Sequence, residues 1–182
     1  MNSAIFLDRD GVIIENCDKY VRSWDDVKFL PLSLQALNLL NQTTYKIIIT
    51  SNQSVVGRGI ISEEQSQEIN RRIIEDITSV GGRVDGIFVC PHIPEDHCSC
   101  RKPKPGLILQ AAQALSIDLP SSIMIGDALT DIVAGSAAGI KTLIMVKTGR
   151  GKEQYKLSLS ASYPSFVATD NLLTAISLLS QF

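Results

Sequence analysis

Asp8 and Asp10 stand two residues apart, where the apolar run 4–7 ends and Gly11 frees the backbone. Because alternate side chains of a strand share a face, a strand that ends here delivers both carboxylates to one rim of a sheet. Paired carboxylates can hold a hard cation such as Mg²⁺, and one of them can also attack phosphorus. Acid-rich turns after strands are also common as plain solvated turns, so this segment alone leaves both interpretations open.

Three further polar groups occur where the chain changes from one predicted element to the next. Residues 50–54 have the sequence Thr-Ser-Asn-Gln-Ser, which can surround phosphate oxygens with donors but also makes an ordinary turn. The segment 101–106 places three cations before a helix that Pro105 can begin. Asp127 ends an apolar run, with Asp131 one helical turn later, and helix capping is the simpler role for Asp127.

These groups need a scaffold that brings them together, and the apolar pattern predicts one. Short apolar runs alternate with segments of helical spacing. We expect strands at 4–7, 45–50, 86–89, 122–125 and 142–146. We expect helices at 33–41, 62–79, 107–116 and 128–138, and a last helix from Asp170 to the end of the chain. This alternation predicts an α/β fold, a three-layer, Rossmann-like arrangement whose central, mostly parallel sheet is covered on both faces.

Ligands of such sheets bind at the carboxyl ends of the strands. Asp8, Ser51, Cys90 and Asp127 would all emerge at that edge. The polar segment 147–165, with glycines at positions 149 and 151, predicts a mobile surface connection. No repeat or convincing boundary divides the 182 residues, so we expect one domain spanning 1–182.

The composition argues against several classes of partner. A net charge of −2 gives no electrostatic footprint for nucleic acid or an anionic membrane, so an anionic substrate needs a local cluster of cations. The first predicted strand starts at residue 4, which leaves no room for a signal peptide. No segment approaches the roughly 18 uninterrupted apolar residues of a membrane span. We therefore expect a cytoplasmic monomer that acts on a small molecule, without a nucleic-acid or membrane partner.

Three of the four cysteines lie within eleven residues of one another, together with a histidine, as Cys90, His92, Cys98 and Cys100. In a chain without an export signal, this spacing favours a metal site over disulfides or incidental cysteines. Two closely spaced pairs of soft ligands suit a tetrahedral, structural Zn²⁺, so we call residues 90–100 the zinc loop, inserted after the third strand. His97 is the alternative to His92 as the fourth ligand, but it is less favoured because it is adjacent to Cys98. The remaining cysteine, Cys17, is interpreted as a plain thiol.

In their order along the chain, these groups resemble the four motifs of the haloacid dehalogenase superfamily of phosphohydrolases. The motifs correspond to Asp8-x-Asp10-Gly11, then Ser51, then Lys102, and last Gly126-Asp127 with Asp131. The resemblance covers residues 4 to about 146 and implies Mg-dependent hydrolysis of a phosphomonoester. Asp131 is expected to support its loop rather than bind the metal.

The resemblance implies a role for each motif residue. Asp8 would be the nucleophile and form an aspartyl-phosphate. Asp10 would act as general acid and base, protonating the leaving oxygen and then activating water. Ser51 and Lys102 would balance charge on the transferring phosphoryl group. Mg²⁺ would be held by the carboxylates of Asp8 and Asp127 and by the backbone carbonyl of Asp10.

The zinc loop is followed at once by Arg101-Lys102-Pro103, and this combination resembles the zinc-bearing, capless branch of the superfamily. That branch includes heptose-bisphosphate phosphatases and histidinol phosphatases, in which short loops around the site select the substrate. The zinc would brace a loop that brings Arg101 over the site, where its fork can grip a phosphate or sugar oxygen. Asn52 matches a substrate-contacting position of the same branch.

The branch leaves a choice between two substrates. The short gap between the cysteine pairs looks more like histidinol phosphatases, whereas 104–106 and 20–24 look closer to the heptose enzymes. A bisphosphate needs extra positive charge, which Arg101, Lys104 and Arg58 could offer. We therefore expect removal of the 7-phosphate of D-glycero-D-manno-heptose 1,7-bisphosphate, with histidinol phosphate as the alternative substrate.

Two positions depart from the family pattern. Leu32 follows Pro31 where glycine is expected, and Ala128 follows Asp127 where a lysine is often found. A non-enzymatic protein, either receiver-like or a zinc-stabilised interaction module, is the remaining alternative. Receiver domains need neither a second acid placed as Asp10 is nor a zinc loop. The net charge argues against a zinc-dependent nucleic-acid module.

Overall fold

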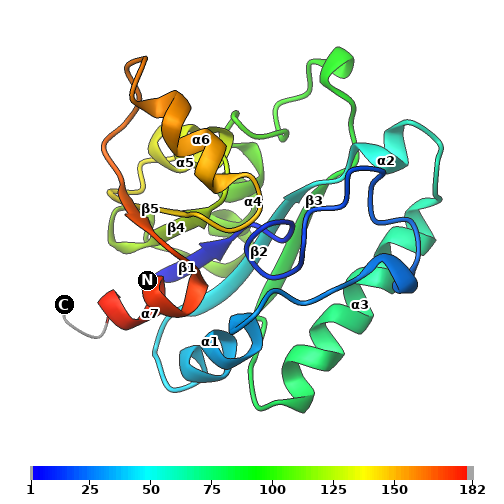
Figure 1. The fold of residues 1–182 in the computed structure, drawn as a ribbon, viewed down its shortest axis with the longest axis horizontal. Coiled ribbons are helices and arrows are strands. Elements are labelled where there is room, and N and C mark those ends of the chain that lie inside the picture. Colours follow the sequence, from blue (N-terminus) through cyan, green and yellow to red (C-terminus); the bar gives the residue numbers. More distant parts are fainter. Residues whose placement is uncertain (1, 180–182) are drawn as a thin grey trace.

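The computed structural model describes residues 2–179, and within them six strands form one sheet (Figure 1). The strands lie in the order β3-β2-β1-β4-β5-β6, and every adjacent pair is parallel. Their bounds are β1 (Ala4–Leu7), β2 (Lys46–Asn52), β3 (Gly86–Cys90), β4 (Ile123–Gly126), β5 (Thr142–Val146) and β6 (Val167–Thr169). The order reverses at β1, so the ligand-binding crevice of this type of sheet falls at the carboxyl ends of β1 and β4.

Helices cover both faces of the sheet (Figure 1). They are α1 (Ser33–Leu40), α2 (Ser54–Gly57), α3 (Glu63–Ser79), α4 (Gly106–Leu115), α5 (Leu129–Ala137), α6 (Gly151–Ser158) and α7 (Leu172–Leu179), with 3₁₀ turns η1 (Trp24–Asp26), η2 (Pro94–Asp96) and η3 (Leu119–Ser121). Side chains of β1 alternate between the faces: Ile5 and Leu7 pack in the cluster formed with α1, α3 and α7. Ala4 and Phe6 pack in the cluster formed with α4 and α5. The predicted three-layer α/β fold is confirmed.

The five predicted strands and the four predicted inner helices are present, with ends within two residues of the prediction. One of these shifts bears on the site, because β2 continues to Asn52 and therefore includes Ser51. The last helix begins at Leu172 rather than Asp170, and its predicted end at residue 182 lies outside the described residues. Within residues 2–179, no helix combines the length and apolar character that a membrane crossing needs.

The prediction of a mobile connection at 147–165 is wrong, because this segment contains α6 and is followed by β6. α6 starts close to the sheet because Gly151 packs against the Val146 carbonyl, where a Cβ would overlap. Tyr155 then holds the helix down through an edge-to-face contact with Phe166, with ring centroids 6.4 Å apart. Tertiary packing stabilises α6, and a weak apolar pattern within the helix does not reveal such packing.

Leu32, where glycine was expected, precedes α1 in a left-handed conformation with φ of 68°. We expect Leu32→Gly to raise the free energy of unfolding by about 1 kcal/mol, because a side chain in this region strains the backbone. Denaturant titration followed by circular dichroism measures the change. The matched control is Leu39→Gly, at a similarly exposed position inside α1, which should lower stability by about 1 kcal/mol. Destabilisation by both substitutions would contradict the strain at Leu32.

Candidate active site

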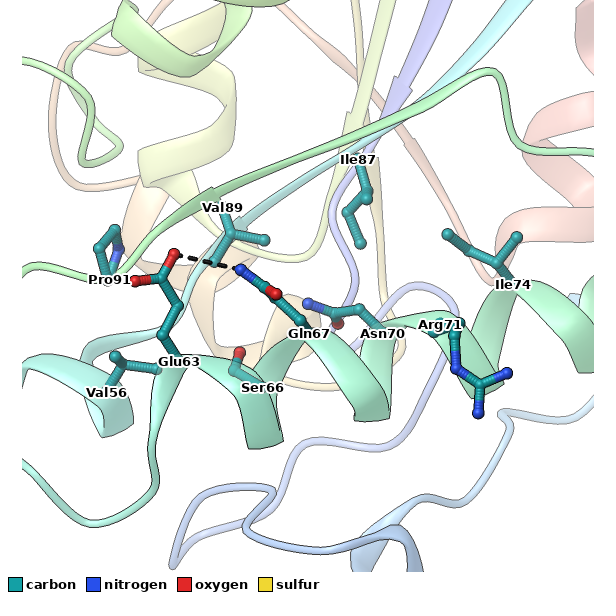
Figure 2. A pocket seen from close by; sticks show the side chains of 10 residues that line it. All are labelled: Val56, Glu63, Ser66, Gln67, Asn70, Arg71, Ile74, Ile87, Val89 and Pro91. Atoms are coloured by element: carbon teal, nitrogen blue, oxygen red, sulfur yellow. Dashed lines mark hydrogen bonds between the residues drawn. The ribbon is translucent and has the colours of Figure 1, made fainter.

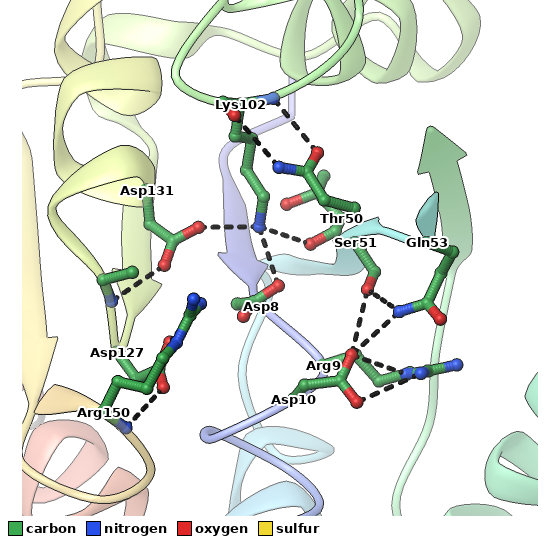
Figure 3. A network of polar contacts seen from close by, with 12 residues as sticks. Asp8, Arg9, Asp10, Thr50, Ser51, Gln53, Lys102, Asp127, Asp131 and Arg150 are labelled. Atoms are coloured by element: carbon green, nitrogen blue, oxygen red, sulfur yellow. Dashed lines mark hydrogen bonds and ion pairs between the residues drawn. The ribbon is translucent and has the colours of Figure 1, made fainter. Parts of the chain in front are cut away.

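The predicted catalytic and magnesium-binding residues lie together at the carboxyl edge of the sheet (Figure 3). Asp8 follows β1, and its backbone N–H continues the pairing with β4 by donating to Ile125 O at 3.0 Å. Ser51 lies near the end of β2, and Asp127 follows β4. Because parallel strands end at the same edge, residues far apart in sequence become neighbours there.

Lys102 joins the two sides of this edge. It is 3% exposed, and its Nζ lies 2.7 Å from Asp8 Oδ1, 2.7 Å from Asp131 Oδ1 and 2.8 Å from the Thr50 carbonyl. Burial by itself lowers the pKa of Lys102, but the Asp131 and Asp8 carboxylates outweigh it and raise the pKa above its ordinary value. The ammonium group therefore stays charged beside Asp8.

Asn52 fixes the loop that carries Lys102. The Asn52 Nδ2 donates to the Lys102 carbonyl at 3.0 Å, and the Lys102 backbone N–H donates to Asn52 Oδ1 at 3.1 Å. The prediction for Asn52 was a substrate contact, and its side chain does line the cavity described below. The reciprocal pair adds a second role, because it aligns the Lys102 backbone with the end of β2.

Three buried acids form a compact group next to Lys102. Oxygens of Asp8, Asp127 and Asp131 lie within 4.8 Å of one another. Burial raises the pKa of Asp8 to about 7, with Lys102 opposing and Asp131 adding to the rise. Burial and the neighbouring Asp8 also raise the pKa of Asp127. The group concentrates negative charge that needs a cation.

The two oxygens of Asp127 differ. Its Oδ2 accepts from Asn16 Nδ2 at 2.7 Å and from the Arg150 backbone N–H at 2.8 Å. Its Oδ1 is buried and has no hydrogen-bond partner among the described residues, with Arg150 Nη2 at 3.6 Å. Asp131, by contrast, uses Oδ2 to accept from the Ala128 N–H at 3.0 Å. A buried, unpartnered carboxylate oxygen among oxygen donors fits a hard divalent cation.

Asp10 faces away from this acid group and toward the end of β2 (Figure 3). Its Oδ2 accepts from Gln53 Nε2 at 2.8 Å and from Ser51 Oγ at 3.3 Å. Arg9 donates to both Asp10 oxygens, from Nε at 3.2 Å and Nη2 at 3.1 Å. The two acids of the first motif therefore have separate surroundings, with Asp8 in the acid cluster and Asp10 in a net of donors.

A cavity of about 370 Å³ opens above these residues. Its lining residues are Asp10, Asn16, Cys17, Asp18, Tyr20, Val21, Asn52, Gln53, Ser54, Arg101, Lys102, Thr130 and Arg150. Arg101 enters from the zinc loop side, and its Nη1 donates to the His92 carbonyl at 3.1 Å. Two residues proposed for a second phosphate are not in this lining: Arg58 follows α2 at the surface, and Lys104 donates to the carbonyls of His97 and Cys98.

Sequence reasoning missed Arg150, Asn16 and the role of Gln53. Arg150 lies in the segment interpreted as a connection, yet the turn 148–150 begins two residues after the end of the buried strand β5. That position, at the carboxyl end of a strand, is the signal that could have identified Arg150. Asn16 has no comparable signal, because the loop that carries it takes its path from tertiary contacts.

The zinc loop brings its four predicted ligands together. Cys90, His92, Cys98 and Cys100 place their ligand atoms within 4.8 Å of one another. The sulfur atoms are separated by 3.1 to 3.6 Å, and His92 Nδ1 lies 3.3 Å from Cys100 Sγ. A tetrahedron with metal–sulfur distances of about 2.3 Å has edges of about 3.8 Å, so the donor set fits zinc closely. His97, the rival ligand, is exposed and outside the group.

Comparisons with known proteins agree on one family. A family model described as HAD-hydrolase-like matches residues 99–175. A D-glycero-β-D-manno-heptose-1,7-bisphosphate 7-phosphatase of Pasteurella multocida is 39% identical over 92% of this chain and 97% of its own. A protein of the same name from Haemophilus influenzae is 40% identical over 82% of this chain and 84% of its own.

Solved structures give the same result. The D,D-heptose 1,7-bisphosphate phosphatase of B. bronchiseptica, complexed with magnesium and phosphate, superposes with a TM-score of 0.92 at 34% identity and covers 98% of both chains. The corresponding enzyme of Burkholderia thailandensis gives a TM-score of 0.75 at 27% identity and covers 100% of both chains. The chain therefore belongs to the heptose-1,7-bisphosphate 7-phosphatase family of haloacid dehalogenase-like phosphatases.

Proposed function

We propose that this phosphatase removes the 7-phosphate of D-glycero-β-D-manno-heptose 1,7-bisphosphate, with Asp8 as the nucleophile. The observation that carries the proposal is the buried Asp8–Lys102 pair beside the unpartnered oxygen of Asp127, under a cavity with two arginines. The named substrate of the relatives supports the choice of sugar. The site is built from one chain, so we also propose a single-domain monomer.

The proposed reaction has two steps. In the first, an Asp8 oxygen bonds to phosphorus while the bond from phosphorus to the sugar oxygen breaks, and Asp10 gives that oxygen a proton. In the second, Asp10 takes a proton from water, which attacks the aspartyl-phosphate and releases inorganic phosphate. Lys102 and Ser51 stabilise the negative phosphoryl oxygens, since Lys102 is held charged at the Asp8 carboxylate.

We propose that Mg²⁺ is held by the carboxylates of Asp8 and Asp127 and by the backbone carbonyl of Asp10. The Asp127 Oδ1, which has no hydrogen-bond partner among the described residues, supports this ligand set. Asp131 already contacts Lys102 and accepts from the Ala128 N–H. These contacts favour a role in holding its loop rather than in binding the metal. When bound, Mg²⁺ supplies positive charge that offsets repulsion between a carboxylate and a phosphate.

We propose that the zinc loop binds one structural Zn²⁺ through Cys90, His92, Cys98 and Cys100. The closed set of four donors leaves no position for a substrate. The carbonyl of His92 receives the Arg101 side chain, so the loop also orients a cation over the cavity.

A second phosphate would meet the two arginines of the cavity. Arg101 and Arg150 both line it, and the Arg150 side chain is 57% exposed and tied only weakly to Asp127. Ala128 supplies no charge at the position after Asp127, where a lysine is often found. Arg150 provides a cation beside the Asp127 carboxylate instead. Two available cations suit a bisphosphate better than histidinol phosphate, which has one phosphate.

The test is a steady-state comparison of phosphate release, with Mg²⁺, from heptose 1,7-bisphosphate in both anomers and from histidinol phosphate. We expect the β-anomer of the bisphosphate to be preferred over histidinol phosphate by about a hundredfold, or roughly 2.7 kcal/mol of transition-state binding. Similar rates on all three esters would leave phosphatase chemistry in place but reject the proposed substrate.

Gly11 gives a sharp test of the metal side of the site. Its φ is +87°, and a Cβ there would overlap Asp127 Oδ2. We expect Gly11→Ala to lower kcat about a hundredfold by displacing this carboxylate. The control is Gly139→Ala, whose φ of +94° gives the same strain but whose Cβ would meet no described atom within 4 Å. Equal turnover of the two variants would show that the Asp127 contact is unimportant.

A further inference from the structure

We propose that Asn70, on the helix α3, is a positioning residue for the general acid Asp10 and acts through the buried side chain of Arg9. The inference deepens the proposed function and rests on it, since it concerns how Asp10 is aimed at the leaving oxygen. Asn70 lies outside the catalytic cavity and contacts neither the phosphate side of the site nor the zinc loop.

The contacts form one continuous chain. Arg9 is 2% exposed and donates from Nε and Nη2 to the two oxygens of Asp10. Its remaining terminal nitrogen, Nη1, donates to Asn70 Oδ1 at 2.7 Å. A guanidinium group has only donors, so the Asn70 atom that faces it must be the amide oxygen. Arg9 is thus held from both sides, by a carboxylate and by an amide.

Asn70 is placed by the core packing of α3. It is 5% exposed and shares the inward face of the helix with Ile69 and Ile73. Its side chain also lines a cavity of about 430 Å³ between α3 and β3, where Ile87 and Val89 form part of the apolar wall (Figure 2). Among the described residues, the hydrogen bond given for Arg9 Nη1 is the one to the Asn70 amide oxygen, which makes the amide the anchor of the guanidinium plane.

The anchor matters because the fork of Arg9 sets the plane of the Asp10 carboxylate. Two parallel donor contacts to one carboxylate fix its orientation as well as its distance. Gln53 and Ser51 contact only Oδ2 of Asp10, so they do not define the plane by themselves. Loss of the Asn70 acceptor leaves a buried donor of Arg9 unpaired, and the guanidinium then turns toward another acceptor. Proton transfer to the leaving oxygen becomes slower.

The experiment compares two phosphate esters that differ in their need for a general acid. The sugar alkoxide of heptose 1,7-bisphosphate must be protonated as it leaves, whereas p-nitrophenolate leaves without a proton. The test variant is Asn70→Leu, which keeps the volume and removes the acceptor. Asn70→Asp keeps an acceptor toward Arg9. Gln67→Leu, one turn earlier on α3 and lining the same cavity, is the control because, among the described residues, its side chain donates to Glu63 and not to Arg9 or Asp10.

We expect Asn70→Leu to lower kcat/KM about tenfold or more for the heptose bisphosphate and less than about twofold for p-nitrophenyl phosphate. The parameter is kcat/KM because it covers the reaction only as far as release of the leaving group, the step in which Asp10 acts as the acid. Asn70→Asp should keep most of the parent value of kcat/KM for the heptose bisphosphate, and Gln67→Leu should leave kcat/KM unchanged for both esters. Equal losses of kcat/KM in Asn70→Leu on both esters, or no loss on either, would overturn the inference. A wild-type protein inactive on both esters would instead overturn the proposed function.

A second measurement keeps the proposal testable if Asn70→Leu folds poorly. In an Asp10→Asn background the general acid is absent, so Asn70→Asp and Gln67→Leu should both leave the residual p-nitrophenyl phosphate rate within about twofold. In the background of the native Asp10, any loss of kcat/KM in Asn70→Asp should appear only on the sugar ester. A loss of Asn70→Asp on p-nitrophenyl phosphate that persists without the acid would mean that Asn70 does not act through Asp10.

Discussion

Replacement of Asp8 by asparagine is expected to abolish phosphate release, by a factor on the order of 10⁴ or more. The amide oxygen of asparagine is a poor nucleophile. Loss of the Asp8 carboxylate also removes one ligand of the proposed Mg²⁺. The fold should survive, because asparagine has the same shape and its oxygen can still accept from Lys102. Steady-state release of phosphate from the heptose bisphosphate measures the loss.

A measurement of thermal stability distinguishes the loss of the nucleophile in Asp8→Asn from unfolding of the variant. Burial raises the pKa of Asp8 from its ordinary value of 3.8 to about 7, so near pH 8 the ionised carboxylate lowers the stability of the folded, metal-free protein. We therefore expect the thermal midpoint of metal-free Asp8→Asn to equal or exceed that of the parent protein near pH 8. The control Asp25→Asn, an exposed acid in η1, should keep full activity. A fully active Asp8→Asn protein would reject Asp8 as nucleophile.

The second large effect is expected at the zinc loop. Cys100→Ser should lower the zinc content of the purified protein from about one atom per chain and destabilise the protein by several kcal/mol, because a structural zinc contributes folding free energy directly. Turnover should fall as well, since Arg101 and Lys102 follow Cys100 immediately and their loop is tied to Asn52. Elemental analysis and thermal unfolding measure the first two effects.

Cys17 provides the matched control for the zinc loop. It is half-buried, free of a disulfide and outside the group of four proposed ligands, although it lines the cavity of the candidate active site. Cys17→Ser should keep the zinc and the thermal midpoint of the parent protein. Zinc absent from freshly prepared, unchelated parent protein would contradict the site altogether, and equal stability of Cys100→Ser would contradict its structural role.

The site motifs could be predicted because each one sits at a boundary that sequence displays directly. Asp8 and Asp127 both end apolar runs, and the run-to-acid transition marks the carboxyl end of a strand. The parallel sheet then brings such ends together without any further information. The four proposed zinc ligands could also be predicted, because all four lie within eleven residues of the sequence.

The parts that sequence reasoning missed depend on contacts between distant segments. α6 is stabilised by Tyr155 and by the close approach of Gly151 to β5, and neither produces a strong helical pattern. Asn70 did leave a signal, since it is a polar residue between Ile69 and Ile73 on the inward face of α3, a face that also includes Ser66. Its partner Arg9 could not be named, because the distance from α3 to the end of β1 is a property of the folded sheet.

The hydrogen bonds that hold the candidate active site together join residues far apart in the sequence. Lys102 meets Asp8 across 94 residues, Asn16 meets Asp127 across 111, and Thr148 donates to the Gly11 carbonyl across 137. Contacts of such separation form only after the intervening loops are closed, and this order makes them late events in folding. During refolding from denaturant, helical signal should therefore return before turnover. The return of enzymatic activity would then report the last step of folding, rather than the early collapse of the chain.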